Sequence, residues 1–135
     1  MLVKCSYSDL SETIQKQLEG YEWKLLQSIN NALKETAEYG ANQLKTPRAY
    51  HDRSGKYSGD WAVKTGGYQK DSRLYSENYV IHNVKHYRLT HLLEYGHIGR
   101  NGKRVQAFQH IKPVEELVTQ KALSEVERVI RENAN

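Results

Sequence analysis

Apolar residues recur at steps of three, four or seven along the first third of the chain. They are Ile14, Leu18, Tyr21, Leu25, Ile29, Leu33, Ala37 and Leu44. This spacing predicts one face of a long helix over residues 11–44. Pro47 is expected to end it, because the residue before a proline avoids the α conformation. Such a helix is roughly 50 Å long, more than a small domain is wide. Either Gly20 or Gly40 breaks it, or a neighbouring subunit covers part of it, which we favour.

Three segments in the middle of the chain predict strands. Residues 60–65 end at the Gly66-Gly67 pair, which predicts a turn. Residues 68–74 are the weaker candidate for their hairpin partner, because most of them are polar or charged. Residues 78–83 have the strongest strand pattern, with β-branched and aromatic side chains in the middle.

Two helices are expected in the second half of the chain. Residues 87–95 predict a short helix that Gly96 stops, and Pro113 is expected to open a final helix. Residues 105–111 between them are expected to return to the sheet. The sequence therefore predicts one α+β domain over residues 1–135. It has a long N-terminal helix, a small and mostly antiparallel sheet with a short helix, and a C-terminal helix.

Composition adds a hint of assembly. Only 38% of the residues are hydrophobic, and the aromatic residues are ten Tyr, two Trp and one Phe. Tyrosine has an apolar ring and a polar hydroxyl, which suits surfaces that become buried only on association. A small polar domain with half-buried tyrosines explains the same composition, so both interpretations stay open.

Charge and cysteine content limit the function classes. The formal net charge is +4, which is mildly basic and less than a dedicated nucleic-acid binder usually carries. Cys5 is the single cysteine, so no internal disulfide is expected. The sequence has no apolar run of signal-peptide or membrane-spanning type. We therefore expect a protein made in the cytoplasm, without a membrane partner.

One group of residues invites a metal-site hypothesis. Imidazole and carboxylate groups are ligands of catalytic zinc, and His91 and Glu94 would share a face of the short helix. His97 lies beyond the expected helix stop, and His110 has no defining spacing. We favour polar residues at a helix end and expect no metal.

Two polar loops, residues 48–59 and 99–104, are predicted to be mobile. Their basic residues are Arg48, Arg53, Lys56, Arg100, Lys103 and Arg104. The first loop also contains His51 and two aromatic residues, Tyr50 and Tyr57. Such residues can contact phosphates and stack on bases. A small basic nucleic-acid-binding or RNA-cleaving protein is therefore the alternative function. We favour the simpler interpretation that these side chains solvate the loops.

Catalytic sequence motifs are missing. The glycines do not form a phosphate-binding loop, and the sequence has neither a nucleophile elbow nor a cysteine pair for zinc. We expect no catalytic residues, no cofactor and no enzymatic activity.

The order of several short motifs resembles the tail-component family of long-tailed bacteriophages. These motifs are Val80-Ile81-His82-Asn83, Tyr87, Leu93-Glu94-Tyr95-Gly96-His97, the basic loop 99–104, and His110-Ile111-Lys112-Pro113. Thr46-Pro47, Ser54-Gly55-Lys56-Tyr57 and Trp61-Ala62-Val63-Lys64 are similar to the upstream part. The resemblance covers roughly residues 10–130. Gln109 and Val114 depart from the family pattern, which puts only the local turn geometry in doubt.

The resemblance implies a structural virion protein of a phage or prophage, which acts in tail completion or head–tail joining. Its partners would be other neck and tail proteins and further copies of itself, in a ring that is commonly hexameric in related neck proteins. The two basic loops are expected to dock these partners, or to face DNA if they line a lumen.

The motif residues receive structural roles from the same resemblance. Glu94 is expected to cap a helix or to pair with a basic residue of the first loop. Gly96 would supply a left-handed turn. His97 and His110 would form a hydrogen bond across the base of the second loop.

Overall fold

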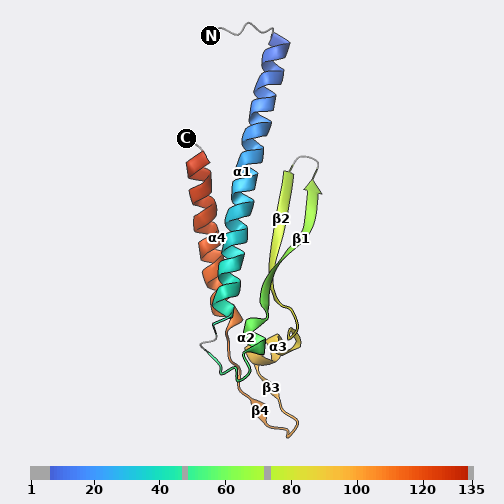
Figure 1. Ribbon diagram of the computed structural model, residues 1–135, viewed down its shortest axis with the longest axis vertical. Coiled ribbons are helices and arrows are strands. Elements are labelled where there is room, and N and C mark those ends of the chain that lie inside the picture. The colour runs from blue at the N-terminus through green and yellow to red at the C-terminus, as the bar shows by residue number, and fades with distance from the viewer. Residues whose placement is uncertain (1–6, 47–48, 72–73, 134–135) are drawn as a thin grey trace.

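The computed structural model describes residues 7–46, 49–71 and 74–133 (Figure 1). Its helices are α1 (Tyr7–Leu44), α2 (Lys56–Gly59), α3 (Arg88–Tyr95) and α4 (Ile111–Asn133). Its strands are β1 (Trp61–Asp71), β2 (Leu74–Asn83), β3 (His97–Ile98) and β4 (Arg104–Val105). The predicted α+β class is confirmed, with the long N-terminal helix, a small antiparallel sheet and the C-terminal helix.

Helix α1 runs without a break through both Gly20 and Gly40, so the alternative in which a glycine interrupts it is wrong. It has 38 residues against 23 in α4, which makes it longer by roughly 20 Å. Figure 1 shows its N-terminal part extending beyond both α4 and the β1–β2 hairpin. Among the described residues, none of the helices combines the length and apolar character that a membrane crossing requires.

Small residues allow the C-terminal half of α1 to pack closely on α4 and β2. Ala32, Thr36 and Ala41 are buried, and the Thr36 hydroxyl donates to the Ala32 carbonyl at 2.8 Å. Gly40 marks the tightest approach. A Cβ atom there would lie 2.6 Å from Val118 Cγ2 and 2.7 Å from Ile81 Cδ1.

The middle of the chain forms two long strands, and the prediction of three short ones is wrong. Trp61 pairs with Asn83 at one end of the hairpin and Asp71 with Leu74 at the other. The expected Gly66-Gly67 turn lies inside β1, where the register shifts between Gly66 and Gln69. Glycine tolerates such a local irregularity in a strand, so the pair is absorbed without ending β1. Tyr68–Asp71 therefore continues β1 and is not a separate partner strand.

The segment before α4 does not rejoin the main sheet, so this prediction is also wrong. Arg104 and Val105 pair with Ile98 and His97 in a second, two-stranded sheet, and residues 106–110 have no regular structure. Helix α4 begins at Ile111, two residues before the expected start at Pro113. A proline is tolerated there because amides of the first turn have no partner within the helix.

The first polar loop is more ordered in structure than predicted. The Asp52 carboxylate accepts hydrogen bonds from the amides of Gly55 at 3.0 Å and Ser58 at 2.8 Å. These bonds hold the pKa of Asp52 below its usual value, against a smaller opposing effect of burial. They also fold residues 56–59 into α2, which buries Tyr57 and Ser58. Tyr57 joins Leu44 and Trp61 in the core, so this part of 48–59 is packed in the interior.

The two glycines of α1 provide a matched pair of stability tests. Gly40→Ala should destabilise the fold by about 1–3 kcal/mol, because the added methyl group overlaps Val118 and Ile81. Gly20→Ala should stabilise it by up to about 1 kcal/mol, because nothing lies within 4 Å and alanine favours the helix. Urea unfolding followed by circular dichroism measures both effects. Equal effects of the two substitutions would contradict the close packing at Gly40.

Candidate functional site

The carboxylate of Glu94, in the last turn of α3, caps the start of α4. Its Oε2 atom accepts hydrogen bonds from the amides of His110 at 2.8 Å and Ile111 at 3.0 Å. Its Oε1 atom accepts one from the amide of Lys112 at 3.0 Å. The amides of a helix's first turn have no acceptors within their own helix. The Glu94 side chain supplies these acceptors for α4. Of the two roles expected for Glu94, the structure shows the cap.

Burial and hydrogen bonding act on Glu94 in opposite directions. Burial by itself raises the pKa of the carboxyl group, while the three amide hydrogen bonds, and the His110 ring when it is protonated, lower it. The net effect is a pKa below its ordinary value. Glu94 therefore stays ionised inside the protein, as a cap of amide donors requires.

The His110 imidazole links this cap to the aromatic core. Its Nδ1 atom lies 2.8 Å from the Phe108 carbonyl oxygen and 3.1 Å from Glu94 Oε2. Both oxygens can only accept, so Nδ1 carries a proton. In the neutral ring Nε2 then accepts a hydrogen bond from the Tyr57 hydroxyl, 2.8 Å away. Glu94, His110 and Tyr57 thus form one buried polar chain.

Three aromatic rings surround His110. The ring centroids of Tyr50, Tyr57 and Trp61 lie 5.0, 5.7 and 6.3 Å from that of the imidazole, all in edge-on arrangements. Burial, followed by the charge of Asp52, raises the pKa of Tyr50 to about 12. Burial raises the pKa of Tyr57 further above its usual range. Both phenols therefore remain protonated, and Tyr57 is available as the donor to His110.

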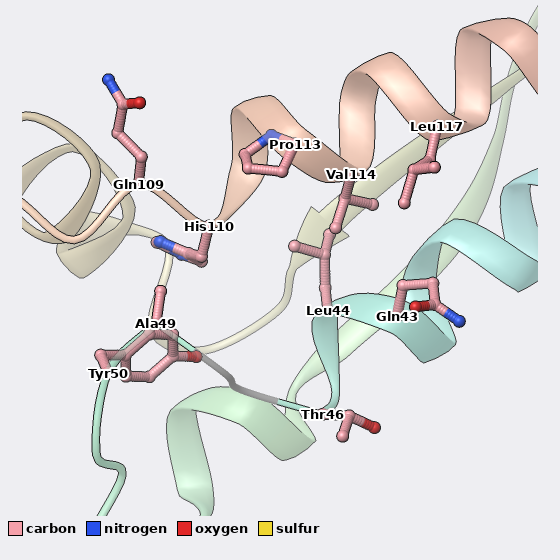
Figure 2. A pocket seen from close by; sticks show the side chains of 10 residues that line it. All are labelled: Gln43, Leu44, Thr46, Ala49, Tyr50, Gln109, His110, Pro113, Val114 and Leu117. Atoms are coloured by element: carbon pink, nitrogen blue, oxygen red, sulfur yellow. The ribbon is translucent and has the colours of Figure 1, made fainter.

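A small cavity of about 170 Å³ opens beside this cluster. Figure 2 shows Tyr50 and His110 at one end of it and Gln43 and Leu117 at the other. The Tyr50 hydroxyl is buried and has no hydrogen-bond partner among the described atoms. A larger hollow of about 530 Å³ lies between β2 and α4.

A second polar chain fixes the end of β2. The Asn83 side-chain amide donates to the Tyr57 carbonyl at 2.9 Å and accepts from the His86 amide at 2.8 Å. The His86 ring forms a short contact with the Asp60 carboxylate. Asn83, from the strand motif 80–83, therefore ties α2 to the turn that leads into α3.

Gly96 has a geometry that requires glycine. Its φ of 73° is positive as expected, but its ψ of 173° places it outside the left-handed helical region that we predicted. A Cβ atom would lie 2.6 Å from the Val105 carbonyl oxygen and 3.0 Å from the Ala107 amide nitrogen. Residues 105–107 come back towards the end of α3 and pass close to Gly96. This close passage explains why the ψ of Gly96 departs from the left-handed helical region.

The other motif histidine does not behave as expected. Within the described part of the chain, the Nδ1 atom of His97 is buried without a hydrogen-bond partner, and no hydrogen bond joins His97 to His110. The expected bond across the base of the second loop is therefore not formed, because Tyr57 and the Phe108 carbonyl engage the two ring nitrogens of His110.

The residues of the metal hypothesis are not arranged as ligands. Glu94 directs both oxygens at α4, and His91 is exposed and stacks on Tyr95. Within the part of the chain that the structure describes, no group of three His, Cys, Asp or Glu side chains could hold a metal ion.

The basic candidates are all exposed where the structure describes them. These are Arg53, Lys56, Arg100, Lys103 and Arg104; Arg48 lies outside the described residues. Arg104 Nη2 donates to the Tyr95 carbonyl oxygen at 3.4 Å, which joins the second loop to the end of α3.

Sequence reasoning missed the core role of Tyr57, which was considered only as a base-stacking residue. Tyr57 and Trp61 are four residues apart, and both are buried. Asp52, three residues before Gly55, was a further signal, since aspartate often accepts amide hydrogen bonds of the turn that follows it.

Comparisons with protein-family models, with curated proteins and with solved structures give no match for this chain. The resemblance to the tail-component family therefore rests on the sequence motifs alone.

Removing the charge of Glu94 should destabilise the fold. We expect Glu94→Gln to lower the free energy of unfolding by about 2 kcal/mol at neutral pH, because charged acceptors make the stronger hydrogen bonds. The folded-state pKa of Glu94 is lowered, so its contribution is present above the unfolded value near 4.5 and is lost as the pH falls through the folded-state pKa. The difference between wild type and variant should therefore shrink below pH 4.5. Urea unfolding at several pH values measures it, with the exposed Glu38→Gln as control; a pH-independent difference would contradict the cap.

The hydroxyl of Tyr57 can be tested in the same assay. Tyr57→Phe should cost about 1 kcal/mol, because it leaves His110 Nε2 buried without its donor. Tyr87→Phe changes the same group on a ring that is more than half exposed, and should change stability little. An equal loss in both variants would count against the Tyr57–His110 hydrogen bond.

Proposed function

We propose that this chain is a non-enzymatic structural protein of a long-tailed bacteriophage or prophage. It acts in tail completion or head–tail joining, as a ring-forming component of the neck or tail end. It is made in the host cytoplasm and becomes part of the virion. Its partners are copies of itself, with six to a ring as the resemblance implies, and the neighbouring neck and tail proteins.

The uncovered N-terminal half of α1 is the observation that carries this proposal. Helical spacing places Leu18, Leu25 and Ala32 on one face. Along that face the side chains change from 56% exposed at Leu18, through partly buried at Leu25, to 4% exposed at Ala32. The apolar pattern continues beyond the point where this chain's own elements cover it. Ile14 and Tyr21, which are 48% and 44% exposed, extend the same face.

An apolar face of this kind is typical of a surface that a second chain covers. Head-to-tail contact between copies generates a ring when the rotation closes. We name Ile14, Leu18 and Tyr21 the α1 stripe. Helix α1 extends beyond the elements of the same chain that pack on it. Contact of the α1 stripe with a neighbouring copy is the simplest explanation.

The polar groups that suggested chemistry support a structural role. Both oxygens of Glu94 accept amide hydrogen bonds of α4, and the ring of His110 is held between Phe108 and Tyr57. A general acid or base needs a free position for its substrate. These groups are engaged in the fold, which favours assembly over catalysis.

Light scattering after size-exclusion chromatography, over a series of protein concentrations, tests the assembly. We expect a ring, or a monomer that shifts towards one as concentration rises, because burial of the α1 stripe favours association. Leu18→Gln should weaken this association at least tenfold, which corresponds to about 1.4 kcal/mol. Leu123→Gln alters a similarly exposed leucine of α4 and should leave the assembly intact.

A strict monomer at every concentration would contradict ring formation by this chain alone. Deletion of the gene in the phage or prophage that encodes it tests the role in the virion. Separate heads and tails are expected from the deletion, with rescue by the wild-type chain and not by Leu18→Gln. Intact virions from the deletion strain would overturn the proposed function.

A further inference from the structure

The excess positive charge of the chain lies in one segment. Residues 84–105 contain five basic residues and a single carboxylate, that of Glu94. The basic residues, which we name the basic end, are Lys85, Arg88, Arg100, Lys103 and Arg104. The rest of the chain has fifteen residues of each sign, so the formal net charge of +4 belongs entirely to this segment.

The fold brings these residues together at one end of the molecule. Helix α3 and the β3–β4 loop lie at the end opposite the N-terminus of α1 (Figure 1). On α3, Arg88, His91 and Tyr95 are spaced to share one side of the helix, and all three are exposed. The hydrogen bond from Arg104 to the Tyr95 carbonyl oxygen places the basic loop at the end of that side. Arg88 and the basic loop therefore lie along one side of α3, and Lys85 comes three residues before Arg88 in the chain.

Among the described residues, no carboxylate forms an ion pair with the basic end. The ion pairs found among residues 7–46, 49–71 and 74–133 are on α4 or involve His86 and His110, and none includes a residue of the basic end. Glu94 is buried and engaged by α4. A surface of this kind attracts a polyanion and releases its counterions on binding.

The aromatic side chains of this surface favour double-stranded over single-stranded nucleic acid. Arg88 lies over the Tyr87 ring at 5.9 Å, and His91 stacks on Tyr95 with 6.4 Å between centroids and 13° between planes. Each exposed tyrosine ring thus has a neighbour on one face, which hinders the stacking of successive bases that single strands need. Contact with a ring leaves the charge of Arg88 in place, so the cations of the basic end can still attract phosphates.

We propose that the basic end binds the phosphate backbone of double-stranded DNA, without sequence preference. Lys85, Arg88, Arg100, Lys103 and Arg104 supply the phosphate contacts. This binding goes beyond the structural role proposed above and does not require the ring, so a monomer would also show it.

Fluorescence anisotropy of a labelled duplex of about 20 base pairs tests the proposal, with salt varied from about 50 to 200 mM. Five phosphate contacts predict that affinity falls by roughly two to three orders of magnitude over this range. The triple variant Arg100→Gln, Lys103→Gln, Arg104→Gln should bind more weakly at low salt, and its affinity should fall by only roughly tenfold. The control variant Lys34→Gln, Lys45→Gln, Lys64→Gln removes the same charge from exposed positions elsewhere and should keep the wild-type salt dependence.

Two outcomes would overturn the proposal. One is equal loss of binding in both triple variants, which would show attraction by net charge alone. The other is tighter binding of a single strand of the same length, which would show base stacking. Circular dichroism of each variant confirms that it is folded, and light scattering under the same conditions reports its oligomeric state separately.

Discussion

The three hydrogen bonds that Glu94 accepts from the first turn of α4 connect the two halves of the fold. Glu94 belongs to α3, and the three amides that donate to it lie sixteen to eighteen residues further along the chain. Because the cap fixes the backbone at His110, it also sets the ring that receives the Tyr57 hydroxyl. The Tyr57 carbonyl in turn accepts from Asn83 at the end of β2. One buried carboxylate thus begins a chain of polar contacts through four segments, and such networks are stable only when every member has a partner.

This cap also gives a physical reason for motifs that are far apart in the sequence. The segment around Glu94 supplies the acceptor, and the segment from His110 to Pro113 supplies the amides. Gly96 follows Glu94 at a point where the returning chain at Val105 leaves no room for a side chain. A carboxylate with low exposure is costly to bury alone, and here three amides and an imidazole offset that cost.

The sequence predicted the elements whose signals are local. The spacing of apolar residues placed α1 within a few residues, and Pro47 marked its end. The start of α4 was predicted two residues late, because the cap that allows an earlier start comes from another helix. The Gly66-Gly67 pair suggested a turn, yet a long partner strand absorbed it within β1. The polar residues around Tyr57 concealed its burial, and Asn83, which donates to the Tyr57 carbonyl, lies 26 residues away in the sequence.

Glu94 and His110 are engaged in the fold, and the two surfaces for which we propose roles lie at opposite ends of the molecule (Figure 1). The α1 stripe is apolar, and residues 12–24 around it are close to neutral, with three Glu and two Lys. Residues 84–105, which include the basic end, carry the whole formal net charge of +4. If copies associate through the stripe into a closed ring, rotational symmetry places every basic end on the same side of that ring. Weak phosphate contacts from single copies would then act together on one duplex, and their combined affinity would exceed that of any single copy by orders of magnitude. The ring and the basic end would then strengthen one another, although neither needs the other in order to exist.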